Sequence, residues 1–306
     1  MNLIIIGKGN HIVKNILPAI SRSRKIAVSG YIDKSNHYHC SLTGQVKSVD
    51  ENFYLEHKDK YFYVATPIAT HFLICKNLLQ RGLNVICEKL LAIKESEAKE
   101  LFSLSNGNLH EVCMYKYHKA YDFVVQYVSL NQANITKIEV DFKIPTLPLS
   151  DFRYNKELGG GAINDLGFYP ISFLEALPFE KKYSNSSYNI DDELDIDTDG
   201  SLTFSLGSAK LVATWGIGKD YTNRIKITES DKIIVIDRFF SKPFDFEMKA
   251  TYHDFTGNVS DKIVLGADDQ FKNMIESIGL RELNKHDSNN SLNIISLIEK
   301  VRGNKF

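Results

Sequence analysis

Three residues of the chain have the types and spacing needed to move a proton to or from an oxygen atom: Lys89, Asp165 and Tyr169. Asp165 and Tyr169 are four residues apart, so on a helix they would lie on one face. A phenol can donate a proton, and a lysine near it lowers the pKa of the phenol and polarises a substrate oxygen. The three residues therefore predict acid–base chemistry on a carbonyl or alcohol group. The alternatives are a solvated strand end, an acid near a helix N-terminus and a half-buried aromatic ring, respectively.

A short glycine motif could bind phosphate groups. Gly7-Lys8-Gly9 follows the apolar segment 3–6 and precedes a stretch with a helical pattern. In this context the first glycine allows a tight turn, and the second lets the backbone approach a pyrophosphate at the N-terminus of the helix. Ile12 stands where the full fingerprint has its third glycine. The motif predicts a dinucleotide site, and a plain strand–helix turn is the alternative.

The end of the second predicted strand bears on which dinucleotide would bind. Asp33 follows the strand-like segment 25–32. An acid at this point accepts hydrogen bonds from the adenosine ribose hydroxyls and favours NAD. Lys34 and Ser35 come next and could instead hold the 2′-phosphate of NADP. We therefore expect NAD or NADP as the cofactor, with NAD slightly favoured.

The pattern of apolar residues predicts the elements that position these side chains. In the first 117 residues, helical patterns separate short apolar strands at 3–6, 25–32, 61–65, 84–87 and 112–114. This alternation predicts βαβ units around a parallel sheet. Further along, strands follow one another without helices between them, at 201–206, 210–215, 224–228 and 232–236. Consecutive strands of this kind indicate an antiparallel sheet. The sequence therefore predicts an α/β Rossmann domain over residues 1–117 and an α+β domain with a mainly antiparallel, open-faced sheet over residues 118–306.

Four segments occur in an order and spacing that match one known enzyme family. They read VATPIATH at 64–71, VICEKLLA at 85–92, MYKYH at 114–118 and GGGAINDLGFY at 159–169. The first, second and fourth resemble the T-P-N-x-x-H, E-K-P and G-G-G-x-x-x-D-x-G-x-[H/Y] blocks of the glucose–fructose oxidoreductase/inositol dehydrogenase family (Gfo/Idh/MocA). The third lies where that family crosses between its domains. The resemblance covers most of the chain.

The resemblance implies hydride transfer between a nicotinamide cofactor and the carbonyl or alcohol of a sugar or nucleotide-linked sugar. Tyr169 would be the proton donor, Lys89 would polarise the substrate oxygen and Asp165 would orient the reacting group by hydrogen bonding. Lys116 and His118 are the next candidates for the polarising role. The cofactor-binding residues would be Gly7, Gly9, Asn10, His11, Asp33, Lys34, Thr66, Pro67, His71, Glu88 and Lys89.

Some later residues indicate one branch of the family, and other residues differ from the family pattern. Residues 215–218 (WGIG), Tyr221, Asn223 and residues 238–243 (RFFSKP) are similar to members encoded with surface-polysaccharide and nucleotide-sugar genes. Leu90 replaces the family's proline, so we expect a trans peptide bond before it. Ile68 replaces an asparagine near the nicotinamide. Two alternatives follow: a dihydrodiol or polyol dehydrogenase of the same family, or a degraded relative that binds cofactor without turnover.

Bulk properties exclude several classes of partner. The formal net charge is −1, which gives no general attraction to nucleic acid or to acidic membranes. No apolar run approaches the ~20 residues of a membrane span, and the N-terminus lacks the pattern of a signal peptide. We therefore expect a cytoplasmic protein. The segment HYHC at 37–40 is expected to form an exposed loop rather than a metal site, because adjacent ligands rarely converge on one ion.

The open-faced sheet also suggests self-association. A sheet with helices on one side leaves its other face bare. We expect a homo-oligomer, either a dimer or a tetramer, in which a partner buries strand residues such as Leu211, Ala213 and Trp215.

Overall fold

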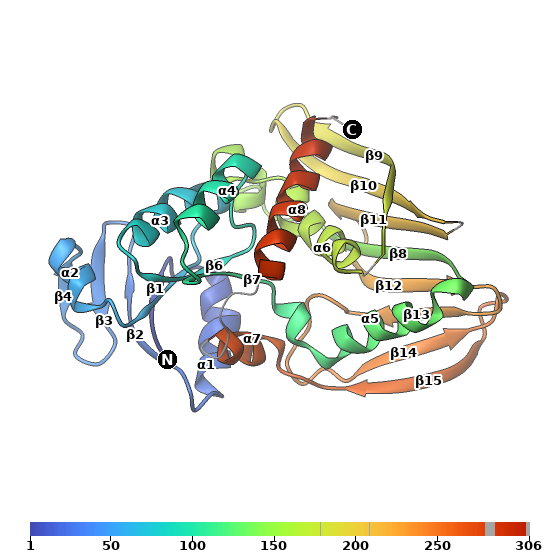
Figure 1. The fold of residues 1–306 in the computed structure, drawn as a ribbon, viewed down its shortest axis with the longest axis horizontal. Helices are drawn as coiled ribbons and strands as arrows, with labels where there is room; N and C mark the ends of the chain where they lie inside the picture. The colour runs from blue at the N-terminus through green and yellow to red at the C-terminus, as the bar shows by residue number, and fades with distance from the viewer. Residues whose placement is uncertain (178, 208, 279–284, 304–306) are drawn as a thin grey trace. The chain divides into compact units, whose positions relative to one another are not determined.

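The computed structural model describes residues 1–177, 179–207, 209–278 and 285–303. The chain forms two compact units, which are drawn in Figure 1. The first comprises Met1–Cys113 and Phe271–Ile295, and the second comprises Met114–Gln270 and Ser296–Phe306. This differs from the two consecutive blocks expected from the sequence, because a late segment returns to the first unit.

The first unit contains a seven-stranded sheet in the order β4-β3-β2-β1-β5-β6-β7. Five neighbouring strands are parallel: β1 (Asn2–Ile6), β2 (Ala27–Ile32), β5 (Tyr61–Val64), β6 (Asn84–Glu88) and β7 (Leu109–Val112). Their central residues are buried, as in a sheet covered by helices on both faces. The Rossmann fold predicted for this part of the chain is therefore confirmed.

Two antiparallel strands at the edge of this sheet were not predicted. They are β3 (His37–Cys40) and β4 (Val46–Ser48). The expectation of an exposed loop at residues 37–40 was wrong, because Tyr38 is only 5% exposed and donates its hydroxyl to the carbonyl of Ser29 at 2.8 Å. Within the described ranges, no three His, Cys, Asp or Glu side chains are grouped to hold a metal ion.

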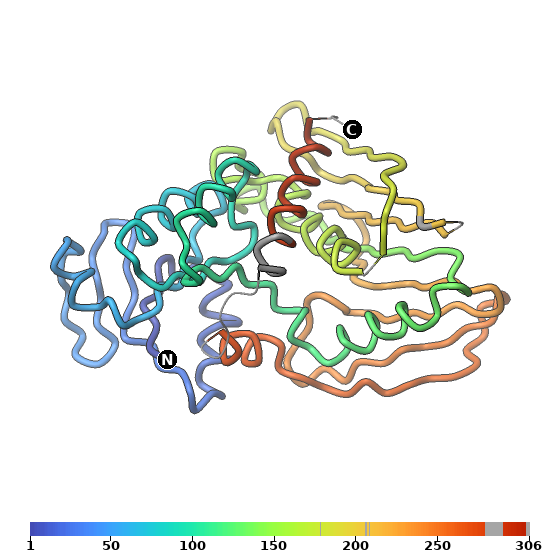
Figure 2. The backbone as a smooth tube through the Cα atoms, viewed as in Figure 1, coloured from blue at the N-terminus to red at the C-terminus, as the bar shows by residue number. Residues whose placement is uncertain are grey.

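The helices of the first unit come from both ends of the chain. The N-terminal part forms the π-helical turn η1 (Ile12–Ile16), α1 (Leu17–Ser21), α2 (Glu51–Glu56), α3 (Ile68–Gln80) and α4 (Glu95–Leu104). Helix α7 (Gln270–Ile278) joins them, and Figure 2 shows it beside the first helical segment. Ser23 donates to the Glu276 carboxylate at 2.6 Å, and Phe271 meets the His11 ring edge-on at 5.7 Å between centroids. These contacts explain why Phe271–Ile295 belongs to the first unit.

The second unit is built on an eight-stranded sheet in the order β15-β14-β13-β12-β8-β11-β10-β9. Neighbouring strands are antiparallel except for the pair β8 and β11. The mainly antiparallel sheet is therefore confirmed. Its strands are β8 (Ile135–Ile144), β9 (Lys182–Asp191), β10 (Ile196–Leu206), β11 (Ala209–Ile217), β12 (Thr222–Glu229), β13 (Ile233–Asp237), β14 (Met248–His253) and β15 (Val259–Gly266).

Helices cover one face of this sheet, as Figure 1 shows for α5 (Lys119–Asn131) and α6 (Phe168–Ala176). Leu211, Ala213 and Trp215 of β11 are fully buried within the chain itself. Their assignment to the open face of the sheet was wrong. The alternation of side chains along a strand shows which residues share a face, but it does not show which of the two faces the helices cover. No partner could bury them further.

The other face of the sheet carries charged side chains. Arg224 Nε lies 3.2 Å from Asp141 Oδ2, and Lys226 Nζ lies 3.4 Å from Glu139 Oε2. An oligomer formed through this face would therefore have a polar interface. The last of the described helices is α8 (Lys285–Gly303). None of the described helices combines the length and the apolar character needed to span a membrane.

Candidate active site

The glycine turn after β1 has the geometry that a dinucleotide site requires. Gly7 has a φ of +88°, and a Cβ atom there would lie 2.8 Å from the carbonyl oxygen of Ala65. Both features exclude a side chain at this position. A Cβ atom on Gly9 would meet nothing within 4 Å, so the backbone is open to an approaching group. Asn10 and His11 follow at the start of the helical segment.

His11 links this turn to the end of β6. Its Nε2 lies 2.9 Å from Glu88 Oε1, and Asn15 contacts its Nδ1 at 3.1 Å. The same carboxylate oxygen of Glu88 accepts the Tyr63 hydroxyl at 2.5 Å. Burial alone would raise the pKa of Glu88, but His11 and the two hydrogen bonds hold it below its usual value. Two predicted cofactor residues are thus in contact, with Tyr63 as a partner that the sequence did not suggest.

Contacts of His71 hold the segment that carries Lys89. The peptide bond between Lys89 and Leu90 is cis, so the trans bond expected from the loss of proline was wrong. The expectation used only the intrinsic preference of the peptide bond, whereas tertiary contacts fix this backbone. His71 Nδ1 lies 2.8 Å from the carbonyl oxygen of Leu90, and its Nε2 lies 2.8 Å from that of Thr66. His71 therefore connects two predicted cofactor-binding blocks.

Burial lowers the pKa of His71, so its ring is neutral at neutral pH. A neutral imidazole donates from one nitrogen, so it can satisfy only one of the two carbonyl oxygens at a time.

The block that contains Thr66 continues into helix α3. Pro67 precedes the first turn of α3, where Thr70 donates to the Pro67 carbonyl at 2.7 Å. Ile68, which replaces the family's asparagine, is buried in this turn.

Asp33 lies at the end of β2, as predicted, and its carboxylate has several local partners. It accepts the backbone N–H groups of Ser35 and His37 at 2.8 and 3.0 Å, and His39 Nε2 lies 2.8 Å from its other oxygen. The hydrogen bond with His39, followed by the backbone donors, lowers the pKa of Asp33 to about 2. The carboxylate is therefore charged throughout the physiological range. Lys34 beside it is exposed.

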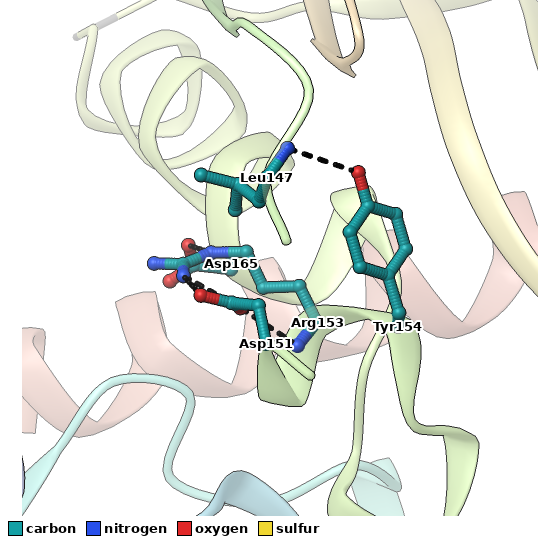
Figure 3. A network of polar contacts seen from close by, with 5 residues as sticks. All are labelled: Leu147, Asp151, Arg153, Tyr154 and Asp165. Atoms are coloured by element: carbon teal, nitrogen blue, oxygen red, sulfur yellow. Dashed lines mark hydrogen bonds and ion pairs between the residues drawn. The ribbon is translucent and has the colours of Figure 1, made fainter. Parts of the chain in front are cut away.

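In the second unit, Asp165 belongs to a compact ion-pair network, drawn in Figure 3. Arg153 Nε donates to Asp165 Oδ2 at 2.6 Å, and Arg153 Nη1 donates to Asp151 at 3.0 Å. Tyr154 accepts the backbone N–H of Leu147 at 3.3 Å beside them. Although burial alone would lower the pKa of Arg153, the two carboxylates raise it, and the guanidinium stays charged. Arg153 is a site residue that the sequence analysis missed.

The glycine turn before Asp165 fits against this network. The N–H of Gly161 donates to the carbonyl of Arg153 at 2.8 Å, and a Cβ atom on Gly160 would lie 2.6 Å from that same carbonyl oxygen. Asp197 accepts the N–H of Ile163 at 2.6 Å where the helix begins. The acidic stretch 191–199 therefore includes a buried carboxylate. Burial raises the pKa of Asp197 to about 6.

Tyr169 follows in the same helical segment, where the π-helical turn η6 (Ile163–Gly167) leads into α6. Its ring packs against aromatic neighbours, with Phe142 and Phe240 at 5.1 and 5.6 Å between centroids. Its hydroxyl donates to Met114 Sδ at 3.6 Å. His118, a fallback candidate, caps α5 by accepting the Ala120 N–H at 3.0 Å. Burial lowers the pKa of His118 to about 4, so it cannot act as a cation at neutral pH.

Comparison with known proteins shows what the chain is similar to. Residues 1–115 match the family model GFO_IDH_MocA, described as "Oxidoreductase family, NAD-binding Rossmann fold". The dTDP-3,4-didehydro-2,6-dideoxy-alpha-D-glucose 3-reductase of Actinomadura kijaniata is 28% identical over 255 residues, which cover 78% of this chain and 75% of that one. Over residues 1–115 the chain is therefore similar to the Gfo/Idh/MocA oxidoreductase family. The resemblance inferred from the four sequence blocks is thus confirmed.

Another relative bears the name of a different activity. The trans-1,2-dihydrobenzene-1,2-diol dehydrogenase of Xenopus laevis is 28% identical over 189 residues, covering 59% of this chain and 56% of that one. Among solved structures, KijD10, a 3-ketoreductase from Actinomadura kijaniata in complex with NADP and TDP-benzene, matches with a TM-score of 0.87. Its sequence identity is 23%, and the match covers 99% of this chain and 97% of KijD10. This likeness confirms the two-part fold.

Proposed function

We propose that the chain is a nicotinamide-dependent reductase that acts on a keto group of a nucleotide-linked sugar. The observation that carries the proposal is the match over 78% of the chain to a relative named as a dTDP-keto-sugar 3-reductase. Two further relatives bear the same name and are 28% and 27% identical over 192 and 219 residues. The Gly-Gly-Gly segment, with Asp165 and Tyr169, supports the same class of reaction.

The residues of the first unit fit a dinucleotide. The open backbone at Gly9 and the positive φ of Gly7 would receive the pyrophosphate at the N-terminus of the helix. Asn10, His11, Thr66, Pro67, His71 and Glu88 complete the proposed cofactor-binding set. When bound, the cofactor supplies the hydride, and the protein provides alignment and electrostatics.

The proposed roles of the protein side chains concern the substrate oxygen. Tyr169 donates a proton to this oxygen as the carbonyl becomes an alcohol. Lys89 polarises the same oxygen and favours the ionised form of the phenol. Asp165 accepts the hydrogen bond of Arg153 Nε at 2.6 Å, and in this proposal it orients the reacting group.

Asp33 favours NAD in this proposal. Its carboxylate is charged, and the 2′-phosphate of NADP would be repelled by it, whereas ribose hydroxyls would donate to it. Lys34, His37 and His39 add positive or titratable groups nearby, and KijD10 was solved with NADP. Calorimetric titration with each cofactor in parallel decides between them.

A second candidate function is dihydrodiol oxidation, which the Xenopus laevis relative favours. The two functions are separated by a panel of dTDP-linked keto sugars, free aldoses, polyols and dihydrodiols, with nicotinamide absorbance as the readout. Turnover confined to nucleotide-linked sugars supports the proposal. Turnover confined to dihydrodiols replaces it with the second function, and cofactor that binds without any redox change indicates a degraded relative.

A further inference from the structure

Arg238 adopts a backbone conformation that is unusual for its residue type. It follows β13 directly and has a φ of +52°. Elsewhere in the described part of the chain, a positive φ at a residue other than glycine occurs only at Asn36 and Asp195, whose residue types tolerate this region best. A strained residue persists only where its surroundings impose the conformation, and such residues are concentrated at binding and active sites. The backbone of Arg238 therefore calls for both a structural cause and a functional reason.

Three buried polar side chains provide the structural cause, because they fix the segment that follows Arg238. Asn223 Oδ1 accepts the N–H of Phe240 at 2.9 Å, and Asn223 Nδ2 donates to the carbonyl of the next residue at 2.9 Å. Gln270 Nε2 donates to the Phe240 carbonyl at 3.1 Å, and Gln270 Oε1 accepts from Lys242 Nζ at 2.7 Å. All three side chains are buried. The segment is thus fixed to the interior of the second unit, and the exposed Arg238 precedes it at the surface.

The guanidinium of Arg238 contacts aromatic rings and has no polar partner among the described residues. Its Cζ atom lies 5.8 Å from the ring centroid of Tyr221 and 5.4 Å from that of Phe246. Both distances are within the range of cation–π attraction, so the two rings restrict the side chain. The guanidinium makes no ion pair or hydrogen bond with the residues that the structure describes. Its five N–H donors are therefore available to a ligand.

These features select an anion with several acceptor oxygens as the ligand. The planar fork of a guanidinium donates two parallel hydrogen bonds to a phosphate, and such charge-assisted bonds are among the strong ones in proteins. The rings and the fixed backbone order the Arg238 side chain before a ligand arrives, so binding costs less conformational entropy. A phosphate or diphosphate group is therefore the ligand chemistry that fits.

The position of Arg238 in the second unit suits the substrate of the proposed reaction. Phe240, two residues later, packs on Tyr169 with 5.6 Å between the ring centroids. Two residues of extended chain span at most about 7 Å, so the backbone of Arg238 lies within that distance of Phe240. A nucleotide-linked sugar carries its diphosphate directly on the sugar ring. A substrate that reacts at Tyr169 would thus have its phosphates within reach of Arg238.

We propose that Arg238, held by the rings of Tyr221 and Phe246, binds the diphosphate of the nucleotide-linked substrate. This inference rests on the proposed function for the identity of the substrate. The site differs from the glycine turn of the first unit, which is proposed for the pyrophosphate of the cofactor. It also gives one reason for Asn223 and residues 238–243 to occur together, since the buried anchor and the strained segment serve the same guanidinium.

Calorimetric titration of the whole protein with dTDP tests the site, and titration with NAD and NADP provides the reference. Arg238→Asn removes the guanidinium and introduces a residue type that tolerates a positive φ, so the variant should fold. Arg238→Lys keeps the charge but lacks the planar fork. Arg224→Gln is the matched control, because it removes an arginine of the same sheet whose Nε already lies 3.2 Å from Asp141 Oδ2.

We expect the wild type to bind dTDP, and Arg238→Asn to bind it roughly tenfold or more weakly, since hydrogen bonds between charged groups contribute strongly. Arg238→Lys should show an intermediate loss, and Arg224→Gln should bind dTDP like the wild type. All three variants should keep the wild-type affinity for the cofactor within about twofold. If Arg238→Asn does not fold, as judged by circular dichroism, Arg238→Lys decides the question.

Turnover of a dTDP-linked keto sugar gives a second readout. Arg238→Asn should raise KM by roughly tenfold or more and leave kcat within a few-fold, because the diphosphate is held equally in the ground state and in the transition state. A residue that only maintained the fold would not produce this separation of KM from kcat.

Four results would overturn the site: no dTDP binding by the wild type, unchanged dTDP affinity in a folded Arg238 variant, an equal loss in Arg224→Gln, or an equal loss of cofactor affinity. The third would indicate a general effect of charge, and the last would assign Arg238 to the cofactor. The proposed function is tested separately by hydride transfer. Arg238-dependent binding of dTDP without turnover on any substrate would reject the reductase and keep the site, whereas turnover with an unchanged KM in Arg238→Asn would do the reverse.

Discussion

Removing a single oxygen atom from Tyr169 should separate catalysis from folding. Tyr169→Phe keeps the ring, which is 7% exposed and packs against Tyr115, Phe142, Phe168 and Phe240. The hydroxyl that this substitution removes donates a hydrogen bond to Met114 Sδ at 3.6 Å. Sulfur is a weak acceptor, so the free energy of unfolding should fall by less than about 1 kcal/mol.

The effect on turnover should be much larger. General acid catalysis contributes about 10²–10⁴-fold, and a hundredfold loss corresponds to about 2.7 kcal/mol of transition-state stabilisation. We therefore expect kcat to fall at least a hundredfold, while cofactor affinity stays within a few-fold. Lys89→Met, which keeps the aliphatic stem and removes the charge, should show the same pattern if Lys89 polarises the substrate oxygen.

Tyr115→Phe is the matched control, because it removes the hydroxyl of a fully buried neighbour that is not assigned to the reaction. That hydroxyl lies 2.9 Å from Ser172 Oγ, so its loss should cost about 1 kcal/mol of stability. The control should therefore lose stability and keep its turnover, and Tyr169→Phe should do the opposite. The assay is nicotinamide absorbance, with urea unfolding alongside. Unchanged turnover in Tyr169→Phe would refute the proposed proton donor, whatever Lys89→Met does.

Four further predictions concern other parts of the chain. Gly7→Ala places a methyl group 2.8 Å from the Ala65 carbonyl oxygen, so calorimetry should show at least about tenfold weaker cofactor binding; wild-type-like affinity would reject this site. His71→Leu removes the ring that lies 2.8 Å from the carbonyl oxygens of Thr66 and Leu90 and donates to one of them, so kcat should fall by about tenfold or more. An unchanged kcat in folded protein would show that His71 does not position Lys89. The pKa of Asp197 is raised from 3.8 to about 6, so the folded state binds the proton more tightly than the unfolded state does, and the free energy of unfolding of the wild type should fall as pH rises from about 4 to about 6. Urea unfolding of Asp197→Asn should lack this pH-dependent loss of stability. The same dependence of stability on pH in the wild type and the variant would contradict the prediction. Light scattering at micromolar concentration should give a dimer or tetramer, and a strictly monomeric mass would reject association through the open face.

The elements predicted best were those with a strong apolar pattern. The five parallel strands and strands β10, β11, β12 and β13 were placed from runs of apolar residues, because a strand covered by helices requires them. The fifth strand was shifted: it covers Leu109–Val112 rather than 112–114. Strands β3 and β4 were missed because the segment at 37–40 is polar and has no run of apolar residues that would predict a strand. In the structure, Tyr38 and His39 of this segment hydrogen-bond to Ser29 and Asp33, respectively.

The site was predicted in its residue types but not in its contacts. Asp33, Glu88 and Asp165 were named from their positions, yet His39, Tyr63 and Arg153 were not, because each partner is distant in sequence or has no motif of its own. One signal was present: Arg153 lies a few residues before the glycine turn, where a cation could pair with Asp165. The backbone at Leu90 could not be predicted, since the contact from His71, 19 residues away, is tertiary.

The return of Phe271–Ile295 to the first unit has a consequence for synthesis on the ribosome. The seven strands of the first sheet lie within residues 2–112, so they leave the ribosome long before α7 exists. Until then, the surface that receives Phe271 and Glu276 is without its native cover. The second unit must be made in between, and the first unit is complete only when the late helix arrives. A nascent chain stalled at residue 113 should therefore be less resistant to protease than the same residues in the finished protein.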